Sequence, residues 1–193
     1  MALAHWTEVL EFWFGASDSP EFGRNRRCWF EKSVEFDARM RERFLATHEA
    51  AAAGTLATWA ARPLAALALT VVLDQFPRNM FRGQPRAFAT DADALAVART
   101  MVAHRFDGLL LPVQRLFAYL PFEHAEDLAA QRESLALLEG LRGDETSTDA
   151  ITYAMRHYAV IERFGRFPHR NAILGRASTP EEVAFLAQPG ASF

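Results

Sequence analysis

Residues 63–76, PLAALALTVVLDQF, decide the fold of this chain. Ala and Leu dominate this stretch, and both residues favour helix. Proline fits the first turn of a helix, so the sequence predicts a helix that begins at Pro63. The residue before a proline disfavours helical backbone, so we expect the helix to stop before Pro77. The apolar run from Pro63 to Leu73 predicts a buried helix, and it is shorter than the ~18 residues of a membrane span.

The composition extends the helical prediction to the whole chain. Its 193 residues include 35 Ala but only 9 Val, 3 Ile and 11 Thr, and strands prefer β-branched residues. We therefore expect an all-α protein with a single domain over residues 1–193. The one cysteine, Cys28, excludes a disulfide framework and a zinc site built from several cysteines. A net charge of −3 gives no basic field, so no nucleic-acid partner is expected.

Residues 1–15 show no signal peptide, because they lack a basic start followed by an apolar run. No stretch reaches about 18 uncharged apolar residues, so no membrane partner is expected. A lone thiol without an export signal predicts a cytoplasmic location. The sequence does not indicate an oligomeric state.

Start and stop signals divide the rest of the chain into further helices. Five of them have clear caps and are expected at Trp6–Phe14, 34–53 after Ser33, 91–103 after Thr90 or Asp91, 150–164 after Asp149, and from Pro180 after the Thr179 capping box. Two more are expected at about Val113–Tyr119, ending at Pro121, and at His124–Arg142. The total of about eight helices with short connections implies antiparallel neighbours.

Polar residues inside apolar stripes are candidates for a site, because burying an unpaired polar group costs about 1–3 kcal/mol. Asp74 lies in such a stripe and Arg78 follows four residues later, either as a helix-terminal ion pair or as part of a site. His124 and Glu126 place a base and an acid within one turn. His157 is either a core histidine whose hydrogen bonds are satisfied or a functional residue of the site.

Two carboxylates near His124 have a simpler interpretation. Glu123 and Asp127 are expected in the first turn of the helix that begins there, where negative charge complements the helix dipole.

The segment RFGRFPHRNAILGR, residues 163–176, carries four arginines and one histidine without an acid. Its two phenylalanines are expected to anchor it to the core, and its two glycines allow close backbone approach. Arginines that face one concavity would bind a carboxylate or phosphate. Alternatively, they pair with carboxylates of neighbouring helices. The candidate ligand-binding residues of the segment are Arg163, Arg166, His169, Arg170 and Asn171.

Neither a metal nor a cofactor is predicted. His124, Glu126, His157 and His169 could supply ligands, but no pair has the i, i+4 spacing of a zincin helix, and nearby arginines oppose a cation. The chain has no glycine-rich phosphate loop and no Gly-x-Ser-x-Gly elbow. Nucleophilic serine chemistry is therefore not expected.

Six motifs are similar to those of a known family, bacterial domain-of-unknown-function family 924. They are VLEFWFG, WFEKSVEFD, LDQFPRNMFRG, AFATDADAL, YLPFEHAED and RFGRFPHRNAILGRASTPEEVAFL, and they extend from Val9 to about Leu186. The resemblance implies an all-α, tetratricopeptide-like helical protein with no established activity and no assigned metal or cofactor. The motif positions here are Asp74, Gln75, Arg78, Asn79, Arg82, His124, Glu126, His157, Arg163, Arg166, His169, Arg170 and Asn171.

Two functions of different classes follow from these residues. The first is a pocket in which His124 or His157 acts as general acid or base, oriented by Glu126 or Asp74, while arginines hold a small anionic molecule. Its expected ligand-binding residues are Asp74, Arg78, Asn79, Arg82, Arg163, Arg166, His169, Arg170 and Asn171. The alternative is a non-enzymatic scaffold that binds a protein or a peptide carboxylate. A third interpretation treats the FPRN and FPHRN corners as buried networks that fix helix crossings.

Overall fold

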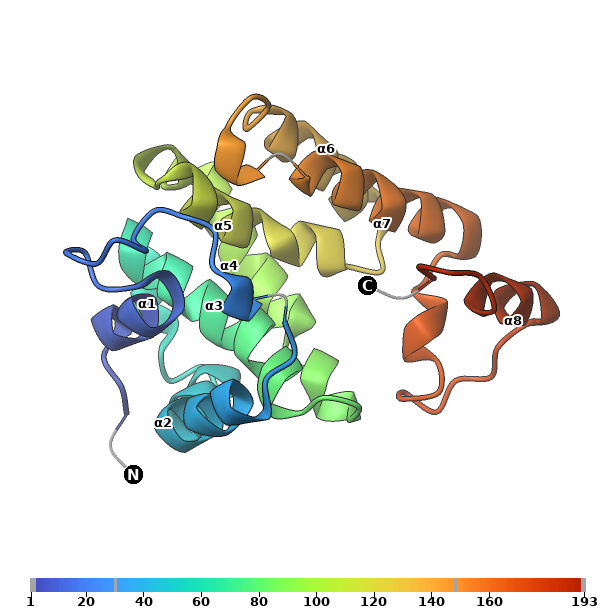
Figure 1. Cartoon of the computed structure of the whole chain (residues 1–193), viewed down its shortest axis with the longest axis horizontal. Coiled ribbons are helices and arrows are strands. Elements are labelled where there is room, and N and C mark those ends of the chain that lie inside the picture. The colour runs from blue at the N-terminus through green and yellow to red at the C-terminus, as the bar shows by residue number, and fades with distance from the viewer. Residues whose placement is uncertain (1–2, 30, 148, 192–193) are drawn as a thin grey trace.

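The computed structural model describes residues 3–29, 31–147 and 149–191, which form eight α-helices joined by loops and short 3-10 turns (Figure 1). The helices are α1 Trp6–Phe14, α2 Val34–Ala52, α3 Pro63–Met80, α4 Asp91–Ala103, α5 Pro112–His124, α6 Leu128–Glu139, α7 Ala150–Phe164 and α8 Pro180–Leu186. No strand occurs within the described residues, so the all-α prediction is confirmed. None of these helices is long and apolar enough to cross a membrane.

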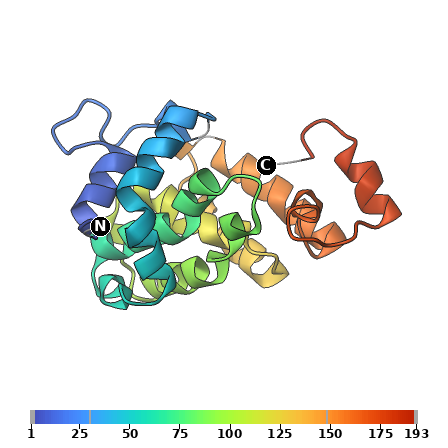
Figure 2. The ribbon, with the colours of Figure 1, turned by 90° about the horizontal axis from the view of Figure 1, so that it is seen from below.

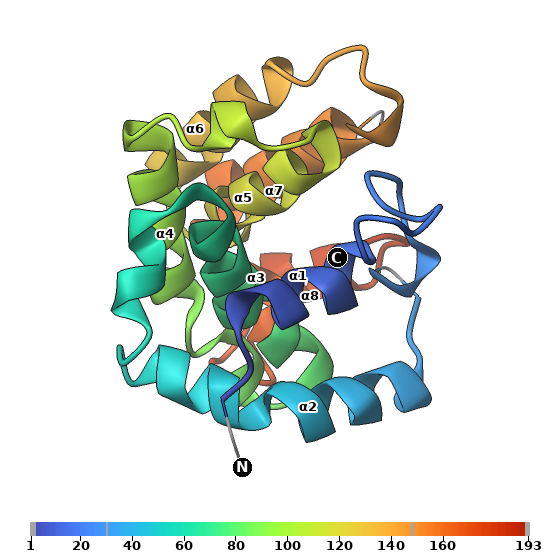
Figure 3. The same ribbon diagram turned by 90° about the vertical axis from the view of Figure 1, so that its left-hand side faces the viewer.

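Helix α3 is the centre of the fold, as its apolar sequence predicts. It packs against α1, α2, α4 and α5, which surround it in Figure 3. Leu67, Val71 and Phe76 are fully buried. Consecutive helices also pack on each other from α2 to α7, and α3 and α5 contribute more buried residues to the main core than the other helices.

The expected stop before Pro77 is wrong, because α3 continues through this proline to Met80. A proline inside a helix leaves the carbonyl four residues earlier without its usual donor. Here the hydroxyl of Thr90 donates to that carbonyl, on Leu73, at 2.5 Å. Because the donor comes from the start of α4, the helix can pass the proline. Arg78 is therefore part of a helix end that faces α4.

The boundary between α5 and α6 also differs from the prediction. Helix α5 passes Pro121 and ends at His124, and α6 begins only after Asp127, whose carboxylate accepts from the Ala129 amide at 3.0 Å. The expected helix from His124 to Arg142 is thus two elements. His124 lies in the last turn of α5, and Glu126 lies in the short link.

A buried glutamine of α6 stabilises this corner. The side-chain amide of Gln131 donates to the carbonyls of Glu123 at 2.6 Å and Ala125 at 2.9 Å. These are carbonyls that the end of α5 would otherwise leave unsatisfied. The link between α5 and α6 is therefore held by Gln131, which lies outside the link, in α6.

The last part of the chain, residues 165–191, is called the C-terminal arm below. It follows α7, contains a short 3-10 turn at Pro168–Arg170 and ends with α8. Figures 1 and 2 show it at one end of the molecule, beside the end of α7. Phe167 is fully buried and forms a small second core with Val160 and Ile161 of α7.

Candidate functional site

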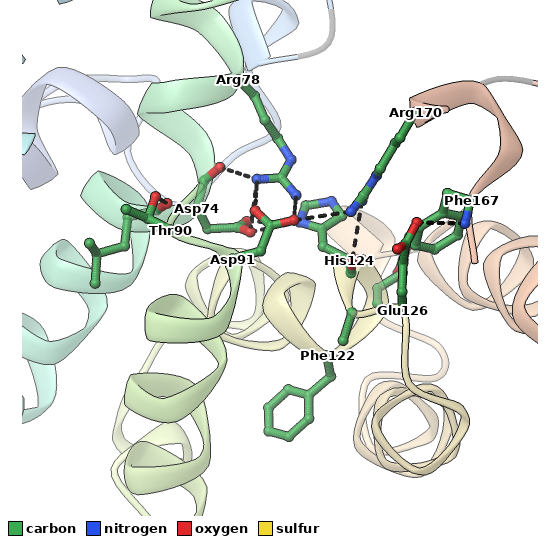
Figure 4. Close-up of polar contacts among 12 residues, drawn as sticks. Asp74, Arg78, Thr90, Asp91, Phe122, His124, Glu126, Phe167 and Arg170 are labelled. Carbon is green, nitrogen blue, oxygen red and sulfur yellow. Dashed lines mark hydrogen bonds and ion pairs between the residues drawn. The ribbon is translucent and has the colours of Figure 1, made fainter. Parts of the chain in front are cut away.

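Four segments that are distant in sequence bring charged side chains together (Figure 4). The end of α3 supplies Asp74 and Arg78, the start of α4 supplies Asp91, and the end of α5 supplies His124. The C-terminal arm adds Arg170. The passage of α3 through its proline places Arg78 here, and the end of α5 at His124 places the histidine opposite Asp74.

Asp74 holds the ring of His124. The carboxylate of Asp74 is fully buried, and its two oxygens lie 2.8 and 3.0 Å from Nδ1 of His124. Gln75 Nε2 donates to Asp74 at 2.5 Å, and Arg78 lies 3.2 Å from the carboxylate. Burial raises the pKa of Asp74, but the charges of Arg78 and His124 outweigh it and hold that pKa well below its usual range. Asp74 is therefore ionised and accepts the Nδ1 proton.

His124 is a neutral imidazole with one accessible nitrogen. Burial, and then the charge of Arg78, lowers its pKa below the ordinary 6.5. The side chain is 15% exposed. Among the described residues, Nε2 of His124 has no hydrogen-bond partner, while Nδ1 is bound to Asp74. The lone pair on Nε2 is thus available to accept a proton.

Two arginines share the carboxylate of Asp91. Arg78 donates to both of its oxygens at 2.8 and 3.0 Å, and Arg170 donates to one at 3.1 Å. Arg170 also donates to the carbonyl of His124 at 3.1 Å. Its guanidinium contacts the rings of Phe88 and Phe167, at 4.7 and 4.5 Å from their centroids.

The positive charge of Arg170 is incompletely compensated. Its side chain is 7% exposed, and its Nε atom is buried without a hydrogen bond to any described residue. Burial, followed by the repulsion of Arg78, lowers the pKa of Arg170 to about 10. Arg170 still carries its proton at pH 7, but its surroundings could accommodate further negative charge.

A second histidine lies close to the first. The Nδ1 atom of His157 is 2.9 Å from the carboxylate of Glu123 and 2.9 Å from the carbonyl of Tyr153. The rings of His157 and His124 are 6.3 Å apart. Both His157 and Glu123 are almost fully buried. The geometry is that of a satisfied core histidine next to the site.

Glu126 holds the C-terminal arm and not a histidine. Its carboxylate accepts from the Phe167 amide at 2.7 Å and from Arg176 at 2.6 and 2.9 Å. Burial raises the pKa of Glu126, but the bonds from Arg176 and Phe167 hold it below its ordinary value. Asp74, and not Glu126, therefore orients His124.

Two predicted ligand-binding residues lie away from this cluster. Asn79 donates to Asp37 of α2 at 2.8 Å, and Arg82 donates to the same carboxylate at 2.6 and 3.1 Å. They join the end of α3 to α2.

The other predicted residues belong to the C-terminal arm and to the end of α7. Arg163 pairs with Glu181 at the surface at 2.7 Å. Arg166 and Asn171 both donate to Glu182, at 2.7 and 3.2 Å. His169 is half-buried beside Phe167, and burial together with the charge of Arg170 lowers its pKa to about 4. The arginines of residues 163–176 thus contact separate carboxylates and do not face one concavity.

Sequence reasoning missed three partners of the site. The sequence places Asp91 at a helix start and Glu123 in the first turn of a helix, but no helix begins at Glu123. Arg176 was one of several arginines in its segment, and nothing in its neighbours distinguishes it. In each case the partner comes from another element, so local sequence carries no signal for it.

Two surface hollows among the described residues lie elsewhere. One, of about 220 Å³, is lined by residues of α7 and α8 that include Arg156, Arg163, Phe164 and Phe185. The other, of about 240 Å³, lies between α2 and the N-terminal residues up to the first turn of α1. Neither is lined by the Asp74–His124 pair, which lies at the edge of a packed charge cluster.

Comparisons with known proteins agree with this fold. Residues 9–190 match the model of DUF924, described as a bacterial protein of unknown function. The chain is similar to a solved structure, the protein of unknown function ATU0120 from Agrobacterium tumefaciens, with a TM-score of 0.83 and 39% identity. That likeness covers 94% of this chain and 96% of the other. No curated protein matches. The chain therefore belongs to the DUF924 family of bacterial proteins of unknown function.

Proposed function

We propose that the chain binds a small anionic molecule where α3, α4 and α5 meet, and that His124 removes a proton from it. The observation that carries this proposal is the Asp74–His124 pair. A buried, ionised carboxylate holds Nδ1 of the histidine and leaves Nε2 accessible and neutral. This is the arrangement that a general base needs.

The proposed step transfers one proton. A proton leaves an acidic O–H, N–H or C–H bond of the ligand and binds to Nε2, while the bonding electrons stay on the ligand. The imidazolium that forms is stabilised by Asp74, 2.8 Å from its other nitrogen. The negative charge left on the ligand faces the guanidinium groups of Arg78 and Arg170, which stabilise it.

A carboxylate or a phosphate is the ligand class that suits this site. Both groups bind guanidinium nitrogens in pairs. Arg170 has an unused Nε donor and a lowered pKa, so additional negative charge beside it would be favourable. Asp91 would then share the two arginines with the ligand.

A second candidate is a tetratricopeptide-like scaffold that binds a peptide carboxylate. Helices α1 and α3, α3 and α5, and α5 and α7 pack on each other in addition to the consecutive pairs, as in arrays of helical hairpins. The hollow between α7 and α8 has an apolar floor and is flanked by two arginines, Arg156 and Arg163. This surface supports the scaffold.

A cytoplasmic location is also part of the proposal. It is supported by the single cysteine, Cys28, which is half-buried.

Ligand screening against a matched pair of histidine variants tests the proposal. A panel of carboxylates and phosphate monoesters is screened by ligand-detected NMR with the wild type, His124→Gln and His104→Gln. His104 is exposed and stacks on Phe106, at the end of α4 opposite to Asp91. We expect a ligand that binds to the wild type and to His104→Gln but not to His124→Gln.

A direct measurement on His124 covers the case in which the panel contains no ligand. Nitrogen-15 NMR of the ring should show the Nδ1–H tautomer and a pKa below 6.5. A ligand that binds His124→Gln as tightly as the wild type would refute the proposed function. So would a His124 ring that titrates at an ordinary pKa.

A further inference from the structure

We infer that the C-terminal arm is a hinged lid over His124, closed by Arg170 and Arg176. The inference rests on the proposed function, because it concerns access to the same histidine. The test of the lid is independent of the proposed function, because movement of the arm can be detected without any ligand.

The arm is held together by its own polar contacts. Glu182 of α8 accepts from Arg166 at 2.7 and 2.8 Å, from Asn171 at 3.2 Å and from the Thr179 amide at 2.7 Å. Arg176 donates its Nε to Asn171 at 3.0 Å. One buried carboxylate therefore joins both halves of the arm, so the arm can move as a unit.

The arm meets the rest of the chain on two sides of different character. On the α7 side the contact has an apolar interior, with Phe185 5.1 Å from Phe164 and Phe167 packed on α7, and the Arg163–Glu181 pair lies at its surface. On the site side the contacts are polar. Arg176 and the Phe167 amide bind Glu126, and Arg170 binds Asp91 and the His124 carbonyl. The main packing partner of α8 is the 3-10 turn of the arm itself.

The hinge lies at Gly165, directly after α7. Its φ of +68° is left-handed backbone, which glycine adopts without strain. No atom lies within 4 Å of the position that a Cβ would occupy, so no side chain packs over this face of the glycine. A rotation here would move the polar side of the arm and keep the apolar contact with α7 near the axis.

The polar contacts differ in how easily water can replace them. Arg176 and Glu126 are 25% and 24% exposed, whereas Arg170 is 7% exposed. The Glu126 pair is therefore the outer latch, and it would open before Arg170 leaves Asp91. The His124 side chain is 15% exposed with the arm in place. Opening would expose more of its ring and the buried, unused Nε of Arg170. Closure would bring that guanidinium onto a bound anion.

Hydrogen exchange with two matched variants tests the lid. Glu126→Gln replaces an ion pair of the latch by a neutral contact. Glu181→Gln does the same to the Arg163–Glu181 pair, which joins the arm to α7 but not to the site. We expect amide exchange in residues 166–178 to rise about tenfold in Glu126→Gln, because charge-assisted hydrogen bonds are the stronger kind. We expect no change in Glu181→Gln.

Access to His124 is measured on the same proteins. Diethyl pyrocarbonate modifies neutral, accessible imidazole, and the rate at His124 should rise in parallel with exchange of the arm. Amides of α3 serve as an internal reference, because they report global unfolding. Arg176→Gln opens the latch from the other side and replaces Glu126→Gln if that variant does not fold.

Three results would overturn the lid. One is unchanged exchange of residues 166–178 in both latch variants. Another is exchange of the arm amides at the same rate as the α3 amides, because the arm would then open only by global unfolding. The third is faster arm exchange without faster modification of His124. None of them depends on a ligand, so the lid can fail while binding at His124 stands. Loss of the ligand difference between the wild type and His124→Gln would leave the lid intact.

Discussion

Replacing Asp74 by asparagine keeps the shape of the side chain and removes its negative charge. The fully buried carboxylate contacts His124, Gln75 and Arg78, so the change falls on all three. Without the charge, the protonated ring of His124 loses its nearest anion. The pKa of His124, already below the ordinary 6.5, should therefore fall further.

The expected loss of stability follows from the contacts that remain. Removing one partner of a buried ion pair costs about 3–5 kcal/mol. Arg78 keeps both of its bonds to Asp91, and an asparagine oxygen can still accept from His124. We therefore expect the lower end, about 3 kcal/mol. In a chain of this size each kcal/mol corresponds to about 2–4 °C, so the Tm at pH 7 should fall by about 6–12 °C.

Calorimetry at pH 7 measures the Tm, and histidine NMR titration measures the pKa of His124. Asp93→Asn is the matched control, because Asp93 is exposed in the first turn of the same α4 that carries Asp91. It should leave both quantities nearly unchanged. A Tm within about 2 °C of the wild type would refute the reasoning about the buried charge. A His124 pKa equal to or above the wild-type value would refute the reasoning about the pair.

Three further changes test other parts of the structure. Thr90→Val removes the donor behind the proline of α3 and should cost about 1–3 kcal/mol in urea unfolding, whereas Thr100→Val, which loses only a bond within α4, should cost less. The folded pKa of His169 is about 4, below the ordinary 6.5, so its neutral ring contributes stability that is present above pH 6.5 and is lost towards pH 4. Urea unfolding at a series of pH values should show this decline, and His169→Gln should flatten it; an equally steep decline in the variant contradicts the assignment. Gly165→Ala should destabilise the protein by about 1 kcal/mol, because residue 165 has left-handed backbone. Gly108→Ala should not, because the φ of Gly108 is not positive. Equal effects of the two substitutions in calorimetry would contradict the strain at residue 165.

The helical class and most helix ends could be predicted, because caps are local. Ser33 and Thr179 begin their helices as their sequences indicate, and Gly165 ends α7. The two predicted proline stops, at Pro77 and Pro121, are wrong, and for Pro77 the reason is not local. At Pro77 the missing donor is replaced by a residue of another helix. Rules based on neighbours in sequence cannot include such a donor.

The central residues of the candidate site could be predicted from the sequence, but their partners could not. Burial of polar residues in apolar stripes identified Asp74, His124 and His157, which the structure brings close together. Their partners were harder to find. Asp91 serves arginines from two segments, one of them 79 residues away, and only the packing of α4 places it there. The arginine-rich segment predicted a shared anion, but most of its arginines have carboxylates of their own.

The sharing of Asp91 by two arginines constrains how this family can change. A lineage that loses Asp91 first leaves Arg170 buried without a carboxylate and Arg78 with Asp74 alone. One that loses Arg170 first still has a satisfied pair, because Arg78 keeps both of its bonds. Substitutions of Arg78, Asp91 and Arg170 therefore have effects that do not add, and their cost depends on the order in which they occur. Natural variation at these positions should be historically ordered, with Asp91 the last of the three to be lost.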